Sequence, residues 1–161
     1  MGWFGDYLYA DGEWSDVDLD DPPSTDPAEP WLLLQIHDSD FAIVRYAPEG
    51  DGSGEAYIGC TPRSYFEDDD ASAPTDVAAE ARGLAAWARV LPAQTAADPE
   101  QVAGLLAGDD DPDPVEDDDD ERADEGIFVE VKCLRFLDML GSGLPRELQE
   151  LRDARRANGQ V

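Results

Sequence analysis

The chain of 161 residues is long enough for one domain with a modest core, and its 39 acidic and 11 basic side chains give a formal net charge of −28. A surface with this charge repels phosphate groups, which argues against direct binding to nucleic acid and to an anionic membrane face. A basic protein is the macromolecular partner that the charge favours. The alternative is a housekeeping or structural domain whose acidity serves only solubility or adaptation to a salt-rich cytoplasm.

The sequence also predicts a cytoplasmic location. The first residues, "MGWFGDYLYADGEW", have neither the basic segment nor the long apolar segment of a signal peptide. No apolar stretch approaches the roughly eighteen residues of a membrane-spanning helix. Cys60 and Cys133 lie far apart in apolar sequence, so we expect two reduced, buried thiols instead of a disulfide.

The first half of the chain has the pattern of short strands separated by turns. Apolar and aromatic runs of strand length predict strands at residues 3–9, 31–36, 40–46 and 55–60. The turn residues of "PEGDGSG" and the other short connections predict that neighbouring strands are antiparallel. Residues 10–30 are rich in proline and acids, and we expect them to form an irregular, mobile surface loop.

Helical periodicity marks the second half. The spacing of apolar residues predicts helices at residues 75–91, 98–108, 126–141 and 144–156. We expect Thr75 and Asp98 to cap the first two helices, and Gly108 to follow the end of the second. Residues 127–132 also alternate in the manner of a strand, which leaves them open between helix and strand, and residues 153–161 are expected to fray.

Strands in the first half and helices in the second predict an α+β fold. We expect a single domain over residues 1–161, with a small antiparallel sheet of three to four strands packed against three to four helices. In this arrangement one face of the sheet is buried beneath the helices.

The acidic run at residues 109–125 contains twelve acids and one arginine. A calcium loop needs glycine at its sixth position and glutamate at its twelfth. Counting from Asp109 puts Pro114 and Asp120 there, and a second acidic start at Asp16 also fails. We therefore expect no bound metal and no cofactor, and interpret the run as a mobile, hydrated loop between two helices.

His37 is the only histidine, and it stands in "IHDSDF" beside Asp38 and Ser39. These are the residue types of a hydrolase triad, but neighbours at a strand end point to different sides. A dyad with Cys60 requires that their strands pair, which is the basis of a small-enzyme alternative. The favoured interpretation is that His37 belongs to a hairpin turn and that the chain has no catalytic residue.

The segment "CTPRSYFEDDD" places Tyr65 and Phe66 directly before an acidic cluster. Aromatic residues beside acids can form the centre of an interface with a charged rim, although entry into the domain core is the favoured reading for these two. As anchors of a partner we expect Trp14 and Tyr65, and as steering charges the acids of both clusters. The predicted partner-binding residues are Trp14, Tyr65, Glu67, Asp68, Asp69, Asp70, Asp117, Asp118, Asp119, Asp120 and Glu121.

A small, strongly acidic α+β chain without a catalytic motif resembles, at the level of class, the bacterial immunity proteins that neutralise secreted toxins. The toxins are often basic nucleases, whose active sites are blocked by acidic surfaces that carry aromatic side chains. The resemblance rests on size, charge and layout over the whole chain, and it assigns no individual residue. It implies a non-enzymatic protein that inhibits or sequesters a basic protein.

Overall fold

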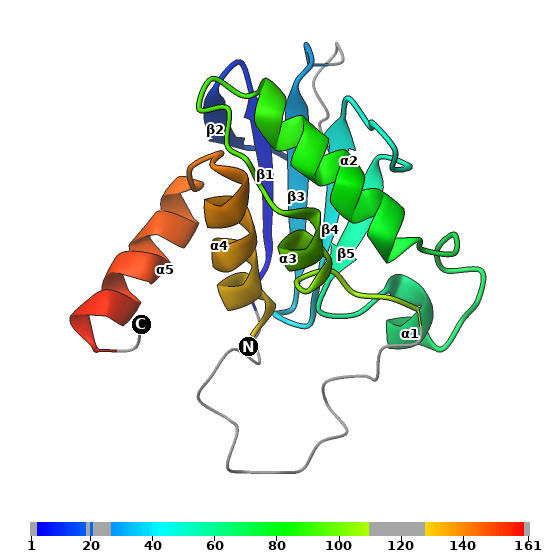
Figure 1. Ribbon diagram of the computed structural model, residues 1–161. Coiled ribbons are helices and arrows are strands. Elements are labelled where there is room, and N and C mark those ends of the chain that lie inside the picture. Colours follow the sequence, from blue (N-terminus) through cyan, green and yellow to red (C-terminus); the bar gives the residue numbers. More distant parts are fainter. Residues whose placement is uncertain (1–2, 19, 21–26, 110–127, 160–161) are drawn as a thin grey trace.

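A five-stranded antiparallel sheet forms the centre of the protein. The computed structural model describes residues 3–18, 20, 27–109 and 128–159. The strands are β1 (Gly5–Ala10), β2 (Glu13–Asp16), β3 (Trp31–His37), β4 (Phe41–Ala47) and β5 (Glu55–Ile58). They lie in the order β2-β1-β3-β4-β5, and every neighbouring pair is antiparallel (Figure 1).

One face of the sheet is buried because side chains alternate along each strand. In β3, Leu34 is fully buried, whereas Leu33 and Gln35 point to the other side and are half-buried. The pairing register continues the buried face across the sheet, since Leu34 lies opposite Tyr7 of β1 and Val44 of β4. The apolar runs seen in the sequence therefore supply one wall of the core.

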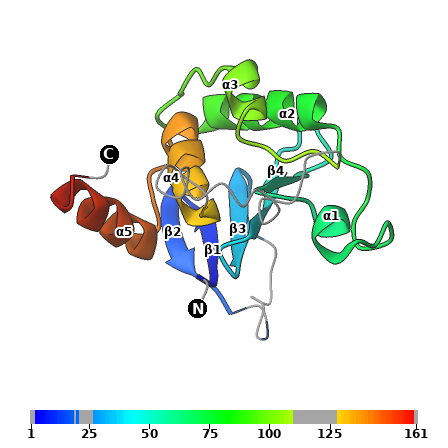
Figure 2. The ribbon, with the colours of Figure 1, turned by 90° about the horizontal axis from the view of Figure 1, so that it is seen from below.

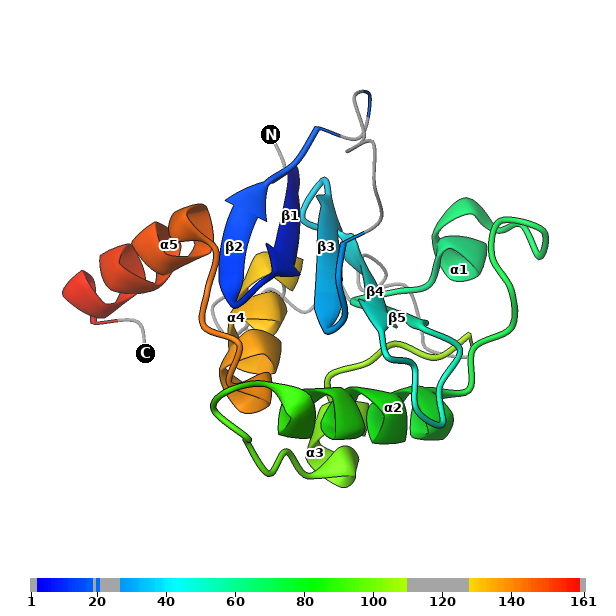
Figure 3. The same cartoon turned by 90° about the horizontal axis from the view of Figure 1, so that it is seen from above.

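Helices supply the other wall. They are α1 (Pro62–Phe66), α2 (Val77–Val90), α3 (Pro99–Ala103), α4 (Val129–Leu140) and α5 (Arg146–Ala157). Figure 3 shows α2, α3 and α4 together on one side of the sheet, with α5 outside the β2 edge. Figures 2 and 3 both show α1 apart from the other helices, at the β4–β5 end of the sheet.

Trp87 of α2 fixes the helical layer to the sheet. Its side chain is fully buried and packs edge-on against Tyr9, with ring centroids 5.6 Å apart. Its indole N–H donates to the carbonyl oxygens of Trp31 (3.0 Å) and Ala47 (3.1 Å), which lie opposite each other in β3 and β4. One side chain thus fills the core and satisfies two carbonyls at the ends of strands.

The α+β fold is confirmed, with five strands and five helices in place of the three to four of each that were predicted. The additional strand is β2, which lies inside residues 10–30 and corrects the prediction of an irregular loop throughout that stretch. A tight turn at Asp11 and Gly12, both with positive φ, returns the chain so that Trp14 pairs with Tyr9. The additional helix is α1, which begins at Pro62.

Several helix boundaries differ from the prediction. Asp76, not Thr75, caps α2, because its carboxylate accepts a hydrogen bond from the N–H of Ala79. Asp98 caps α3 as predicted, but the helix ends at Gly104, before Gly108.

The C-terminal third resolves the choice between helix and strand at 127–132, whereas fraying of residues 153–161 stays a prediction. Helix α4 begins at Val129, so most of the ambiguous stretch 127–132 is helix. Helix α5 continues to Ala157, well into residues 153–161, which were expected to fray. Of the acidic run 109–125, only Asp109 lies within the described residues.

Candidate functional site

The sheet has a second face, opposite α2, α3 and α4, which we call the open face. It carries the side chains that alternate with the buried set, among them Asp6, Gln35 and Ile43, which lie side by side across β1, β3 and β4. In the strands that form it, polar side chains stand among half-buried apolar ones.

No helix of the described ranges is both long and apolar enough to cross a membrane.

Five aromatic rings form a continuous row at the end of the open face where β3 turns into β4. We call Phe4, His37, Phe41, Tyr65 and Phe66 the aromatic row. Successive ring centroids lie 5.3, 5.0, 5.0 and 4.9 Å apart, within the range for edge-on and tilted ring pairs. The row therefore joins the start of β1, the β3–β4 hairpin and α1 into one surface.

Burial changes along the aromatic row in a way that suits an interface. Phe41 in the middle is only 3% exposed, whereas Phe4 and Phe66 at the two ends are 60% and 56% exposed. The prediction that Phe66 enters the domain core is therefore wrong, and Tyr65 is half-buried. Both residues lie on the short helix α1, which begins after the N-cap Thr61 and ends at Glu67 in a left-handed conformation. The ring of Tyr65 packs on Phe41 of the open face and not in the core between sheet and helices.

Carboxylates lie beside the Tyr65 end of the aromatic row. The hydroxyl of Tyr65 donates to Oδ2 of Asp40 at 3.1 Å. This hydrogen bond, with burial and the nearby charge of Asp38, raises the pKa of Tyr65, so the phenol stays protonated as a donor. Asp38 and Asp40 thus hold negative charge beside the rings.

The second group of acids follows α1 directly. Glu67, Asp68, Asp69 and Asp70 are all exposed, and they adjoin Phe66 along the chain. Arg63 pairs with Asp69 at 3.2 Å, which offsets one of these charges. We call these four residues, together with Asp38 and Asp40, the acidic rim.

A hollow of about 260 Å³ lies on the open face beside the aromatic row. Phe4, His37, Phe41 and Ile43 contribute its apolar and aromatic lining, and Asp6 contributes a carboxylate. Its volume is below the roughly 300–1,000 Å³ of typical sites for small molecules and cofactors. The hollow is suited to one side chain of a larger partner.

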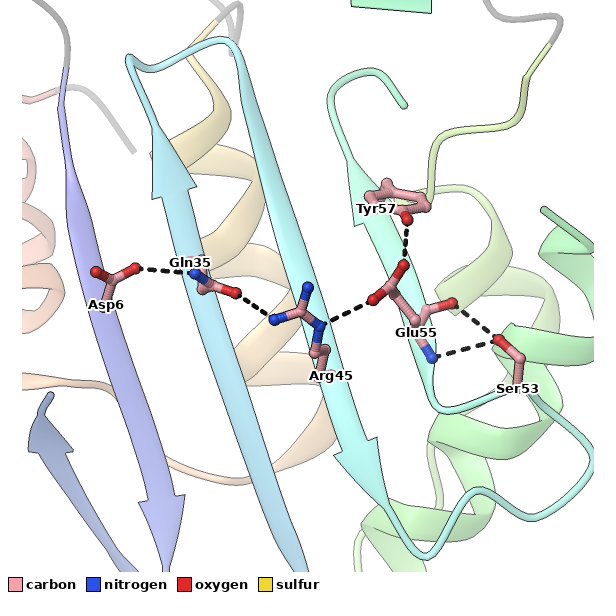
Figure 4. A network of polar contacts seen from close by, with 6 residues as sticks. All are labelled: Asp6, Gln35, Arg45, Ser53, Glu55 and Tyr57. Carbon is pink, nitrogen blue, oxygen red and sulfur yellow. Dashed lines mark hydrogen bonds and ion pairs between the residues drawn. The ribbon is translucent and has the colours of Figure 1, made fainter. Parts of the chain in front are cut away.

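Next to the hollow, a line of polar contacts crosses four strands of the open face (Figure 4). Asp6 accepts from Gln35 at 3.4 Å, Gln35 accepts from Arg45 at 2.9 Å, and Arg45 donates to Glu55 at 2.8 Å. The hydroxyl of Tyr57 donates to the other oxygen of Glu55. The line holds these side chains in place, and two of them, Asp6 and Gln35, also line the hollow.

The residues of "IHDSDF" have separate partners. The ring of His37 packs against the rings of Phe4, Phe41 and Tyr65, and the residue is exposed at the end of β3. Ser39 Oγ accepts from the backbone N–H of Trp3 at 2.7 Å, and Asp40 accepts from Tyr65. His37 is thus a hairpin-end residue as predicted, with Asp38 and Ser39 at positive φ in the turn.

The two cysteines are both buried and are not joined to each other. The Sγ of Cys60 lies 3.9 Å from the carbonyl oxygen of Asp40. Burial raises the pKa of the Cys133 thiol, so this side chain stays protonated and behaves as an apolar residue. Within the ranges that the structure describes, no group of three or more potential ligands could hold a metal ion.

The structure brings together only part of the predicted partner-binding set. Tyr65 and the acids Glu67 to Asp70 lie in one place, at the β4–β5 end of the sheet. Trp14 lies beside the end of β1, whereas the aromatic row lies beside its start. The Trp14 indole donates to the carbonyl of Ser142 at 3.1 Å, and its ring packs on Tyr9. Trp14 is therefore part of the packing between β2 and the chain after α4.

Asp117, Asp118, Asp119, Asp120 and Glu121 lie outside the described residues. Their place relative to the aromatic row stays a prediction from the sequence.

Sequence reasoning missed Phe4, Asp6 and Phe41 as residues of a site on the open face. The signal was the alternation in β3 and β4, since His37 pairs with Phe41 and both point away from the buried Leu34.

In comparisons with known proteins, no family model, no curated protein and no solved structure matches the chain. The site is accordingly interpreted from its own geometry and charge.

Proposed function

We propose that the protein is a non-enzymatic acidic binding protein that inhibits or sequesters a basic protein, in the manner of an immunity protein against a toxin. The observation that carries the proposal is the aromatic row with its acidic rim. Phe4 and Phe66 are more than half exposed at the two ends of a row whose centre is buried. Exposed aromatic rings beside acids offer a basic protein both an apolar contact and a matching charge.

The energetic division between rings and acids follows from general properties of interfaces. Aromatic side chains that become fully desolvated contribute most of the binding energy, about 1.5–3 kcal/mol for burying one phenylalanine. Exposed charges at the edge of an interface contribute mainly to orientation and to the rate of encounter. We therefore assign the residence time of the complex to the aromatic row, and its formation rate to the acids.

We place this function in the cytoplasm, where thiols such as the buried Cys60 and Cys133 remain reduced. If the partner is a toxin, its gene should lie next to the gene of this chain and should encode a strongly basic protein. That neighbour is the first partner to test.

The experiment compares two exposed apolar residues on opposite sides of the molecule. Phe66 is 56% exposed in the aromatic row, and Val90 is 55% exposed at the end of α2, on the helix-covered side. Phe66→Ser should speed dissociation of the basic partner about tenfold, and Val90→Ser should leave it unchanged. Equal effects of the two variants on dissociation would reject the aromatic row as the binding surface.

The alternative is a housekeeping or structural domain whose acidity serves only solubility or salt adaptation, and it predicts a different result for the same measurement. In that case neither Phe66→Ser nor Val90→Ser alters the dissociation rate of any basic protein. Replacing acidic residues then changes solubility alone.

A further inference from the structure

We propose that the hollow on the open face receives the guanidinium group of an arginine side chain from the basic partner. The inference rests on the proposed function and adds the chemical identity of one anchoring residue. It is carried by three observations: the size of the hollow, its uncompensated carboxylate, and its aromatic walls.

The size of the hollow points to a single side chain. About 260 Å³ is enclosed between the start of β1 and the β3–β4 hairpin, with openings to solvent. The lining comes from Phe4 and Asp6 of the first segment, Gln35 and His37 of β3, and Phe41 of β4. A cofactor or substrate of ordinary size is larger than this space.

The charge on the open face is asymmetric. At one end of the polar line, Glu55 pairs with Arg45, with Nε and Oε2 2.8 Å apart. At the other end, the only hydrogen bond from a described residue to the Asp6 carboxylate is the long one from Gln35, at 3.4 Å. No cationic side chain of the described residues pairs with it. The carboxylate beside the hollow is therefore available to an external cation.

The walls of the hollow favour arginine over lysine. The rings of Phe4, His37 and Phe41 are in sequential contact, with centroids 5.3 and 5.0 Å apart, and all three line the hollow. A planar guanidinium stacks on aromatic faces and can donate two parallel hydrogen bonds to one carboxylate. A lysine ammonium is more strongly hydrated and lacks this planar fork, so it gains less from the same walls.

The open face already holds one guanidinium group beside a carboxylate. Arg45 lies on the open face between the amide oxygen of Gln35 and the carboxylate of Glu55 (Figure 4). An arginine seated in the hollow would meet Asp6 on the other side of Gln35. The polar line would then have a cation at each carboxylate.

The test uses the full chain and three short peptides observed by NMR. The peptides are acetyl-Gly-Arg-Gly-amide, the same peptide with lysine, and the same peptide with citrulline, which keeps the planar shape of arginine without its charge. We expect the arginine peptide to bind weakly and to shift the ring signals of Phe4, His37 and Phe41. The lysine and citrulline peptides should give much smaller shifts at the same concentrations.

Two matched variants localise the effect. Asp6→Asn should weaken binding of the arginine peptide about tenfold, as expected for loss of a charge-assisted hydrogen bond. Asp11→Asn removes the same charge from the turn at the far end of β1, and it should leave binding unchanged. The spectrum of each variant reports directly whether its fold is intact.

The inference is overturned if the citrulline or lysine peptide shifts the same rings equally, or if Asp6→Asn and Asp11→Asn behave alike. Its failure is distinguishable from failure of the proposed function. If the peptide test fails while Phe66→Ser still speeds dissociation of the basic partner, the aromatic row remains the binding surface and only the arginine assignment is lost.

Discussion

Tyrosine side chains satisfy carboxylates in this protein. With 39 acids and 11 bases, most carboxylates have no cation to pair with, and phenol groups take that place. Four of the five tyrosines donate to acids, in the pairs Tyr7–Glu147, Tyr46–Glu80, Tyr57–Glu55 and Tyr65–Asp40. Burial and these hydrogen bonds raise the pKa of each phenol, so all four stay donors at neutral pH.

The buried pair of Tyr46 and Glu80 should be the most strongly coupled. Glu80 is 3% exposed, accepts from Tyr46 at 2.6 Å and from the N–H of Ser53 at 2.7 Å. In a double-mutant cycle of Tyr46→Phe and Glu80→Gln, we expect a coupling of about 1–3 kcal/mol in the free energy of unfolding by urea. Tyr7→Phe combined with Glu80→Gln is the control and should be additive, because Tyr7 donates to Glu147 and shares no hydrogen-bond partner with Glu80. A Tyr46 cycle that is also additive contradicts the coupling.

Glu55 should give a pH-dependent contribution to stability. Burial opposes its ionisation, but hydrogen bonds from Tyr57 and Arg45 outweigh this and lower the pKa of Glu55 below its usual value. A group with a lowered folded-state pKa stabilises fully above its unfolded pKa of about 4.3, and this contribution is lost as pH falls through the folded value.

Glu55→Gln should therefore cost about 1 kcal/mol in the free energy of unfolding at pH 7. The difference from the unaltered chain should be constant down to about pH 5 and should shrink below about pH 4. Urea unfolding across this pH range is the measurement, and a difference that grows as pH falls would show that the sign is wrong.

Between elements, α2 packs closely on the β4–β5 turn. At Gly83 of α2 an added Cβ would lie 2.4 Å from the carbonyl oxygen of Glu49 and 2.5 Å from the hydroxyl of Tyr46. The first of these atoms is backbone and cannot move without shifting the turn. Glycine is therefore required here by the packing of a helix on a hairpin.

Gly83→Ala should destabilise the protein by about 1–3 kcal/mol, although alanine normally stabilises a helix interior by about 1 kcal/mol. Gly104 at the end of α3 is the control, because an added Cβ there meets its nearest neighbour at 3.4 Å and its backbone is already right-handed helical. Gly104→Ala should be neutral or slightly stabilising. Thermal unfolding of both variants tests the contrast, and equal stability of Gly83→Ala and the unaltered chain would refute it.

The elements also show which information the sequence carries. Strands β3 and β4 and helices α2, α4 and α5 were predictable because their apolar spacing is regular over seven or more residues. Strand β2 and helix α1 were not, because they hold too little periodicity and their formation depends on partners elsewhere. Trp14, which pairs β2 with Tyr9 of β1, shows this dependence. The equally short β5 and α3 were predicted from their flanking signals, the turn residues before β5 and the Asp98 cap of α3.

The candidate site was predictable only in part for the same reason. Tyr65 and the following acids are adjacent in sequence, so their common surface could be inferred. Phe4 and Phe41 join them only through the pairing of β1, β3 and β4, which sequence alone did not fix.

For the molecule as a whole, charge should control how fast a basic partner is found. Exposed charges are screened beyond about 10 Å at roughly 0.1 M salt, so steering must weaken as salt is added. Replacing the acids of residues 109–125 by serine and asparagine should slow association several-fold at low salt and leave dissociation nearly unchanged. Stopped-flow kinetics at two salt concentrations is the measurement, and an association rate that does not respond at low salt would rule out steering by this run.

We propose above that the aromatic row is the surface that a basic partner covers. Hydroxyl-radical footprinting of the protein, with and without a basic protein that a neighbouring gene is proposed to encode, tests this directly. We expect oxidation of Phe4 and Phe66 to fall several-fold in the complex, and oxidation of Met139 in α4, on the helix-covered side, to stay the same. If Phe4 and Phe66 are oxidised equally in the free protein and in a saturated complex, the aromatic row is not the binding surface.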